Sequence, residues 1–204
     1  MEFILNNICH KTLNIAAICP LSNALGPGKR FVIWVQGCCF SCHNCGSPEW
    51  RPTIDAIQLN PNELATMILS SPDIEGITIS GGEPILQVVG LVETLRLVKA
   101  KRSLSVICYT GFTLEALKER SDPVIDEFLA TIDILVDGPY EDSLNDNKGW
   151  RGSSNQRVYF LSGLYQGLED DFHNRRRDIE IHLLNKKYLL VGIKPTALPA
   201  GIEL

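Results

Sequence analysis

The sequence lacks three features that would point to particular classes of protein. No apolar run approaches the roughly 18 residues that a membrane-spanning helix needs, and the start MEFILNNICHK has no basic segment followed by an apolar one, as a secretory leader has. With 19 Lys and Arg against 24 Asp and Glu, the chain also lacks the basic excess that a broad nucleic-acid surface requires. We therefore expect a cytoplasmic protein that binds neither membranes nor nucleic acids.

The composition is that of a globular protein. The 204 residues are 45% hydrophobic and 21% charged, which is enough to bury a substantial core. We expect one domain that spans residues 1–204. Arg175, Arg176 and Arg177 form a short basic cluster, which we interpret as part of a solvated loop.

Cysteine is the residue that the chain uses unusually. Four of its seven cysteines fall within eight residues of the stretch WVQGCCFSCHNCGSPEW, residues 34–50. Because cysteines stay reduced in the cytoplasm, such a cluster indicates a metal or catalysis more than a disulfide framework. Cys38, Cys42 and Cys45 have the spacing C-x3-C-x2-C, and thiolates are the usual ligands of iron–sulfur clusters. We take residues 37–46, which have a glycine at each end, as the cluster loop.

Apolar runs alternate with helical patterns along the chain, which is typical of α/β folds. Strands are predicted at RFVIWVQ, EGITIS, LSVICYTG, DILVDG and QRVYFLS, and a hairpin turning at NKK is predicted from IEIHLL and YLLVGI. Helices are predicted over residues 61–70, from residue 85 onward, and at TLEALKER and PVIDEFLATI. The cluster loop, SGGEP, YTGFT and VDGPY each follow a predicted strand. Since the carboxyl ends of parallel strands meet at one edge, these four loops should converge on one site.

These motifs together resemble the radical S-adenosylmethionine superfamily. The cysteine spacing is followed about 40 residues later by Gly-Gly-Glu-Pro, and GPGKRFVIWVQGC is similar to the subgroup that activates glycyl-radical enzymes. ISGGEPILQ, YTGFTLEAL, ILVDG and WRGSSNQRV resemble most closely the activating proteins of anaerobic ribonucleoside-triphosphate reductases. The similarity extends from about residue 15 to residue 158. We expect an α/β fold, a partial (β/α) barrel with about five or six parallel strands, because a full barrel typically needs about 250 residues.

The resemblance implies the cofactors and the residues that hold them. Cys38, Cys42 and Cys45 would bind a 4Fe-4S cluster, and the amino and carboxylate groups of S-adenosylmethionine would chelate its open iron. At the GGEP segment, the glycines would admit the methionine amino group, and a strand-end carbonyl or the Glu83 carboxylate would accept its protons. The expected contacts outside the cysteines are Gly81, Gly82, Glu83, Pro84, Thr110 and Gly111.

Five further residues are expected near the cofactor. Asn44 stands where many superfamily members have an aromatic residue against the adenine, and its backbone would make that contact. Asp137 resembles an aspartate that some activases use near a cation beside the cofactor. Ser153, Asn155 and Arg157 would contact the cofactor carboxylate or the substrate.

The resemblance also implies a reaction and a partner. In the superfamily, the reduced cluster gives one electron to the sulfonium, and the resulting 5′-deoxyadenosyl radical takes a hydrogen atom from a substrate. In the subgroup that substrate is a glycine of a glycyl-radical enzyme such as an anaerobic ribonucleotide reductase, and an electron donor such as flavodoxin or ferredoxin reduces the cluster. Leu25 and Gly46 depart from the subgroup, which has Asp before Gly-Pro-Gly and an aromatic residue after the third cysteine.

Two other functions stay open. A radical enzyme that modifies a peptide or a small metabolite would account for Leu25, and a structural zinc module would use the same cysteines with His43. Cys39 permits a second register, C-x2-C-x2-C, but the family spacing favours Cys38 and leaves Cys39 as a small buried filler or a spare thiol. His43 is expected to face solvent or to donate a hydrogen bond. The remaining cysteines, Cys9, Cys19 and Cys108, lie in apolar surroundings and are expected in the core.

Overall fold

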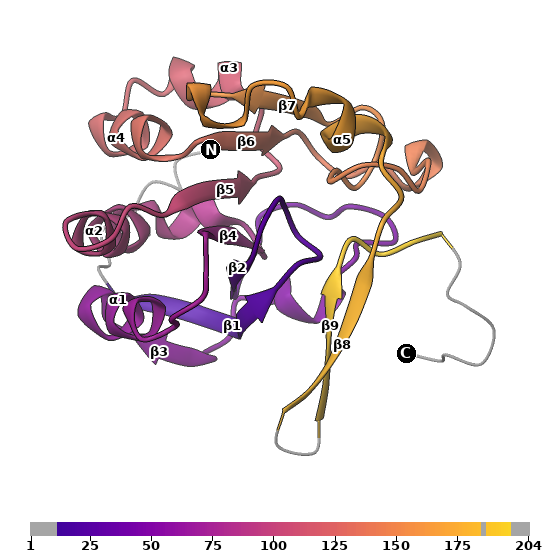
Figure 1. Cartoon of the computed structure of the whole chain (residues 1–204). Coiled ribbons are helices and arrows are strands. Elements are labelled where there is room, and N and C mark those ends of the chain that lie inside the picture. The colour runs from indigo at the N-terminus through magenta and orange to yellow at the C-terminus, as the bar shows by residue number, and fades with distance from the viewer. Residues whose placement is uncertain (1–11, 185–186, 197–204) are drawn as a thin grey trace.

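The computed structural model describes residues 12–184 and 187–196, and its centre is a seven-stranded sheet (Figure 1). Across the sheet, the strands are ordered β3 (Ile57–Leu59), β1 (Leu13–Ser22), β2 (Arg30–Val35), β4 (Gly76–Gly81), β5 (Ser105–Tyr109), β6 (Ile134–Asp137) and β7 (Arg157–Phe160). β8 (Ile179–Leu184) and β9 (Lys187–Gly192) form a separate hairpin beside the sheet. The predicted turn of that hairpin includes residues 185–186, which lie outside the described residues.

The sheet has four parallel strands, β2, β4, β5 and β6, and not the five or six that we expected. β1 and β3 on one side and β7 on the other pair antiparallel. β7 returns antiparallel because the chain between β6 and β7 contains only the 3-10 turn η4 (Asp142–Leu144), whereas a parallel strand needs a crossover helix. The outermost strands of the described sheet do not pair, so the protein has a mixed α/β fold without a closed barrel.

Four helices cover one face of the sheet, where the sequence predicts them: α1 (Pro61–Leu69), α2 (Val88–Lys99), α3 (Leu114–Glu119) and α4 (Pro123–Thr131). α1 begins at a capping box, in which Asn60 Oδ1 accepts from the Glu63 N–H and the Glu63 carboxylate accepts from the Asn60 N–H. The 3-10 turn η3 (Pro84–Gln87) precedes α2, so regular helix starts later than residue 85. In the part of the chain that is described, none of the helices combines the length and apolar character needed to cross a bilayer.

Strand β2 shows how the sheet divides the core. Phe31, Ile33 and Val35 pack among the helices, while Val32 and Trp34 face a second cluster on the other side. Alternate residues of a strand point to opposite faces, and both faces are covered here, so every residue of β2 is buried. β2 is therefore a fixed support for the cluster loop that follows it.

Several single-residue expectations can be compared with the fold. Cys19 and Cys108 are fully buried, as expected, whereas Cys9 lies outside the described residues. The expectation of a solvated basic loop is wrong for Arg177, whose side chain is only 5% exposed because its donors are satisfied within the protein. Sequence patterns did not predict β1, β3 or the short helix α5 (Glu169–Asn174).

Candidate active site at the cluster loop

The cluster loop leaves β2 and is closed at its base by backbone hydrogen bonds. The Gly37 N–H donates to the Trp50 carbonyl at 2.8 Å, and the Cys38 N–H donates to the Arg51 carbonyl at 2.9 Å. Gly37 has φ of +96°, a left-handed conformation that glycine adopts without a steric penalty. The chain therefore turns sharply out of β2 and returns to the same place after the last cysteine.

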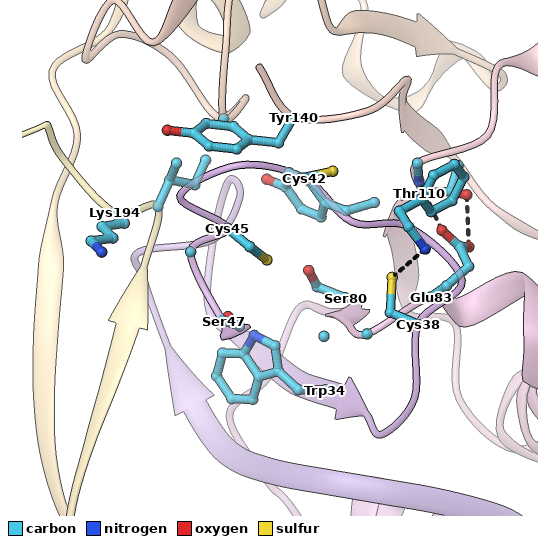
Figure 2. A pocket seen from close by; sticks show the side chains of 18 of the residues that line it. Trp34, Cys38, Cys42, Cys45, Ser47, Ser80, Glu83, Thr110, Tyr140 and Lys194 are labelled. Atoms are coloured by element: carbon cyan, nitrogen blue, oxygen red, sulfur yellow. Dashed lines mark hydrogen bonds between the residues drawn. The ribbon is translucent and has the colours of Figure 1, made fainter. Parts of the chain in front are cut away.

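Cys38, Cys42 and Cys45 line one cavity of about 200 Å³, and their sulfur atoms face the same open space (Figure 2). The segments that follow β4, β5 and β6 contribute to the same wall, with Gly81, Gly82, Glu83, Thr110, Gly111 and Gly138. Apolar side chains complete much of the wall, among them Leu25, Trp34 and Phe40. The four loops that the sequence places after strands thus meet at one cavity.

The donor set of this cavity suits a four-iron cluster. The six cysteines of the described residues are free thiols, and no three Cys, His, Asp or Glu side chains of those residues converge as the ligands of a single metal ion do. In a 4Fe-4S cluster each cysteine binds a different iron, so its ligands stand around an open space. Burial raises the pKa of the Cys38 thiol to about 11. Iron binding at Cys38 therefore has to release a proton.

Of the other residues of the cluster loop, Phe40 and Gly46 line the cavity, and Cys39, His43 and Asn44 do not. Cys39 is exposed and does not line the cavity, so a spare thiol describes it and a buried filler does not. His43 is exposed, as expected. Asn44 Nδ2 donates to Asp142 Oδ2 at 2.8 Å, which ties the loop to the segment after β6. The Phe40 ring packs edge-on against Phe112, with ring centroids 4.9 Å apart.

Gly81 and Gly82 let the end of β4 pack directly against the base of the cluster loop. The Gly82 N–H donates to the Val35 carbonyl at 2.7 Å, and the Glu83 N–H donates to the Gly37 carbonyl at 2.8 Å. A Cβ atom on Gly82 would collide with the Gly37 backbone, and one on Gly81 would collide with the Val35 backbone. Backbone atoms cannot move aside as a flexible side chain can. The glycines are thus required by the protein itself, before any contact with a cofactor.

Glu83 joins the end of β4 to the end of β5 through its buried carboxylate. Oε1 accepts hydrogen bonds from the Thr110 hydroxyl at 2.8 Å and the Ile85 N–H at 2.9 Å, and Oε2 accepts from the Gly111 N–H at 2.8 Å. Burial raises the pKa of Glu83 to about 7, while these donors oppose that rise by stabilising the ionised form. Protein donors thus engage both oxygens of the Glu83 carboxylate.

Two of the predicted contact residues pair with each other outside the cavity wall. Asp137 is fully buried and accepts hydrogen bonds from the Leu114 N–H at 2.6 Å and from Arg157 Nη2 at 2.8 Å. Arg157 also pairs with Glu115 on α3 at 2.5 Å. The structure therefore gives Asp137 and Arg157 a role in fixing α3 against β7.

The other predicted residues of the segment before β7 also bind protein groups. Ser153 Oγ accepts from the Glu141 N–H at 3.1 Å, and Asn155 Nδ2 donates to the Pro139 carbonyl at 2.9 Å. Neither residue lines the cavity, and neither do Pro84 and Asn44. Gly152 and Gln156, from the same segment as Ser153 and Asn155, line it instead.

Arg51 is a cavity residue that the sequence patterns did not indicate. It follows the 3-10 turn η2 (Pro48–Trp50), and its Nε is buried without a hydrogen-bond partner in the described residues. Lys194 is the other cation in the wall, but its ammonium group points away from the three sulfurs (Figure 2). A cation just after the cluster loop is the signal that could have indicated Arg51.

The fold and the site together define an α/β protein with a three-cysteine cavity suited to an iron–sulfur cluster, and comparisons with known proteins identify its family. Residues 24–159 match the family described as a 4Fe-4S single cluster domain. The chain is 31% identical over 153 residues to the anaerobic ribonucleoside-triphosphate reductase-activating protein of Escherichia coli K12, covering 70% of this chain and 95% of the relative. The protein of that name from Enterobacteria phage T4 is 29% identical, covering 72% and 94%. The chain belongs to this family of radical S-adenosylmethionine activating proteins.

One solved structure is a more distant neighbour. QueE from Escherichia coli is similar over 54% of this chain and 57% of its own, with 17% sequence identity and a TM-score of 0.42. The family match ends at residue 159, so α5 and the β8–β9 hairpin lie beyond it.

Proposed function

We propose that this protein is an activating enzyme of the cytoplasm that generates a glycyl radical on a partner of the anaerobic ribonucleotide reductase kind. The observation that carries the proposal is the single cavity lined by Cys38, Cys42 and Cys45 together with the ends of β4 and β5. The relatives from phage T4 and Escherichia coli K12 are activating proteins of anaerobic ribonucleoside-triphosphate reductases, which supports this class of partner. Flavodoxin or ferredoxin is the electron donor that we propose.

A 4Fe-4S cluster held by Cys38, Cys42 and Cys45, once reduced by an electron donor, would pass one electron to bound S-adenosylmethionine, and the carbon–sulfur bond would break to give methionine and a 5′-deoxyadenosyl radical able to take a hydrogen atom from the partner's glycine α-carbon. The protein's own residues position these groups. The three cysteines fix the cluster, and a carbonyl at the end of β4 accepts protons from the methionine amino group. Trp34, Phe40 and Leu25 make the wall apolar, which excludes water from the reacting atoms.

The test of this function is a glycyl radical on a partner protein. The reduced, reconstituted enzyme is mixed without oxygen with S-adenosylmethionine and each glycyl-radical protein of the source organism, and electron paramagnetic resonance spectra are recorded. We expect a glycyl doublet on one partner. We also expect one 5′-deoxyadenosine for each glycyl radical that is generated. Abundant 5′-deoxyadenosine without a protein-borne doublet on any partner would contradict the proposed function. It would support an enzyme that modifies a peptide or a small metabolite, the alternative that Leu25 favours because the activating subgroup has Asp at that position.

Arg51 is the residue that we propose for the carboxylate of S-adenosylmethionine. Its backbone carbonyl accepts a hydrogen bond from the Cys38 N–H, so the Arg51 side chain begins next to the first cluster ligand. Its Nε is buried without a hydrogen-bond acceptor in the described residues, and a bound carboxylate would provide one. Arg51→Gln is expected to weaken S-adenosylmethionine binding by about tenfold or more, because a hydrogen bond to a charged group contributes about 1.5–3 kcal/mol. Calorimetric titration of the reconstituted protein measures this change.

The matched control for Arg51 is Arg96→Gln, which removes an exposed guanidinium that pairs with Glu127 and does not line the cavity. This variant should bind S-adenosylmethionine as the unmodified protein does. Decarboxylated S-adenosylmethionine provides the second control, since Arg51→Gln should barely change its affinity. An equal loss of affinity for both compounds would show that Arg51 does not act on the carboxylate.

A further inference from the structure

A C-terminal segment crosses the cluster loop and completes the cavity. Gly192, Ile193 and Lys194 line the cavity beside the cysteines. A Cβ atom added to Gly46, the residue after Cys45, would lie 3.8 Å from the Lys194 Cβ, so the two segments lie side by side. We call residues 192–196 the strap. The strap lies well beyond residues 24–159, the part of the chain that the family match covers.

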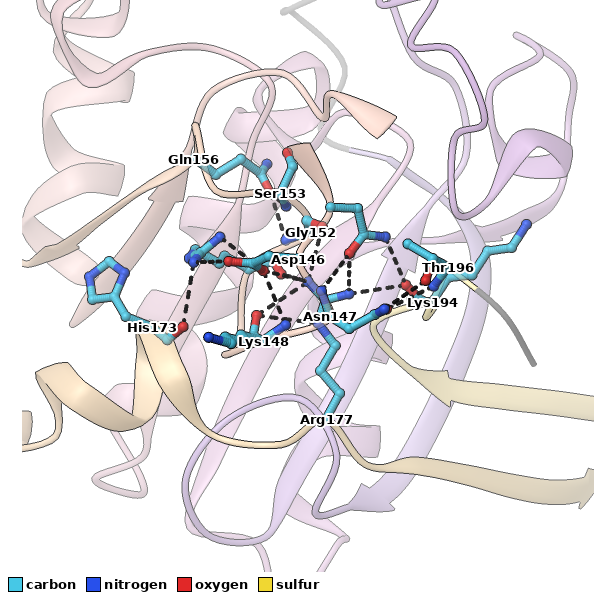
Figure 3. Close-up of polar contacts among 12 residues, drawn as sticks. Asp146, Asn147, Lys148, Gly152, Ser153, Gln156, His173, Arg177, Lys194 and Thr196 are labelled. Carbon is cyan, nitrogen blue, oxygen red and sulfur yellow. Dashed lines mark hydrogen bonds and ion pairs between the residues drawn. The ribbon is translucent and has the colours of Figure 1, made fainter. Parts of the chain in front are cut away.

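Arg177 bonds the strap to the segment between β6 and β7 (Figure 3). Its Nη1 donates to the Lys194 carbonyl at 3.2 Å and to Asn145 Oδ1 at 2.8 Å. Its Nη2 donates to the carbonyls of Arg151 at 2.6 Å and Gly152 at 3.0 Å. Gly152 lines the cavity as the strap does. One buried guanidinium therefore holds two parts of the cavity wall in a fixed relation.

Asn147 fixes the far end of the strap by a reciprocal pair of hydrogen bonds. Its Nδ2 donates to Thr196 Oγ1 at 2.6 Å, and its Oδ1 accepts from the Thr196 N–H at 2.8 Å. At the near end, Val191 is fully buried in the cluster that contains Trp34. The strap is therefore held on both sides of the point where it crosses the cluster loop.

The bonding of Arg177 is not that of an ordinary ion pair. The nearest carboxylate, Asp146, is 4.0 Å away and is already paired with Arg151 at 2.7 Å. The Arg177 guanidinium instead satisfies neutral carbonyl and amide oxygens, and burial lowers its pKa. Removing a charge from water without a close counter-ion is unfavourable, so its contacts must supply the compensation. All of those contacts are to the cavity wall or to the segment that supports it.

We propose that Arg177 and Asn147 are positioning residues that hold the strap over the Cys45 corner of the cluster loop. So held, the strap forms one wall of the cofactor cavity and shields the cluster from solvent on that side. When these bonds are lost, the strap can leave the cluster loop, which exposes the Cys45 corner and removes Gly192, Ile193 and Lys194 from the wall. The inference rests on the proposed function only for the identity of the bound group.

The test uses two variants and one matched control. Asn147→Gly removes both bonds to Thr196 and suits the backbone, because Asn147 has φ of +58°, which glycine adopts freely. Arg177→Met removes the guanidinium and keeps an unbranched side chain. Arg175→Met is the control, since Arg175 pairs with Asp178 at 2.7 Å and stacks 4.1 Å above the Trp150 ring, without a bond to the strap.

Two measurements follow the strap and its effect. In the protein without its cluster, the Thr196 amide should exchange its hydrogen about tenfold faster in Asn147→Gly than in the unmodified protein, because its acceptor is gone. In the anaerobically reconstituted protein, an excess of iron chelator should remove the cluster about tenfold faster in both strap variants. The reason is that the strap leaves the cluster loop more often in these variants, and the chelator reaches the cluster when it does. Arg175→Met should match the unmodified protein in both experiments.

The outcomes separate this inference from the proposed function. Faster exchange at Thr196 with unchanged cluster loss in Asn147→Gly would overturn the shielding role, whatever happens to Arg177→Met. If Arg177→Met fails to fold, Asn147→Gly still decides the matter. A reconstituted protein that holds its cluster but forms no glycyl radical would contradict the proposed function, and the rate of cluster loss would still test the strap.

Discussion

Replacing Cys38, Cys42 or Cys45 with alanine, one at a time, is expected to abolish the 4Fe-4S cluster and with it all cleavage of S-adenosylmethionine. The three thiols line one cavity, and the cluster needs each of them for a different iron. Cys39→Ala is the matched control, because Cys39 belongs to the same loop but is exposed and outside the cavity wall. Iron and sulfide should be measured after anaerobic reconstitution. We expect at least about a tenfold loss of both in the three ligand variants and none in the control.

Two results would contradict this assignment. If Cys39→Ala lost the cluster while Cys38→Ala kept it, the ligands would follow the C-x2-C-x2-C register. If the unmodified protein bound zinc stoichiometrically and took up no sulfide, the loop would be a zinc module. Both results come from the same set of samples. The cysteine series therefore distinguishes the two cysteine registers from each other, and a 4Fe-4S cluster from a zinc site.

The convergence of the site could be predicted because it depends on a general rule of parallel sheets. Cys38, Gly82 and Thr110 are far apart in the sequence, but each follows a strand of the parallel core, and such strand ends share one edge. The segment before β7 reaches the same edge, because β7 returns antiparallel and begins beside the end of β6, but this rule does not indicate which of its side chains face the cavity. There the side chains of Ser153 and Asn155 bind neighbouring backbone groups, and Gln156 lines the cavity.

Contacts between distant segments account for most of what the sequence did not reveal. Arg30 lies in an apolar strand and is fully buried, because Thr78, Ser105 and Tyr165 supply acceptors for its guanidinium. Arg177 is buried for a similar reason, with acceptors on residues 145–152 and 194. No local pattern signals such partners, since each is fixed only when the sheet and the C-terminal segment come together. Periodicity predicts the type of an element well, but neither its direction in the sheet nor the partners of its charged residues.

Gly82→Ala is expected to lower both the stability of the protein and its capacity to hold the cluster. The added methyl group would collide with the backbone of Gly37, the residue that leads into Cys38. To relieve this collision, the end of β4 and the base of the cluster loop must separate, which weakens the hydrogen bonds from Gly82 to Val35 and from Glu83 to Gly37. Overpacking of this kind typically costs about 1–3 kcal/mol, and each weakened hydrogen bond adds about 0.5–1.5 kcal/mol.

Gly46→Ala is the matched control for Gly82→Ala, because Gly46 also lies in the cavity wall but an added Cβ there would make only an ordinary contact with Lys194. Denaturant unfolding of the protein without its cluster measures the loss of stability, and iron content after reconstitution measures the effect on the loop. We expect Gly82→Ala to lose both, and Gly46→Ala to retain both. If Gly82→Ala kept its stability and its iron and lost only S-adenosylmethionine binding, the glycine would serve the approach of the cofactor alone, and the backbone contact between β4 and the cluster loop would not be what requires it.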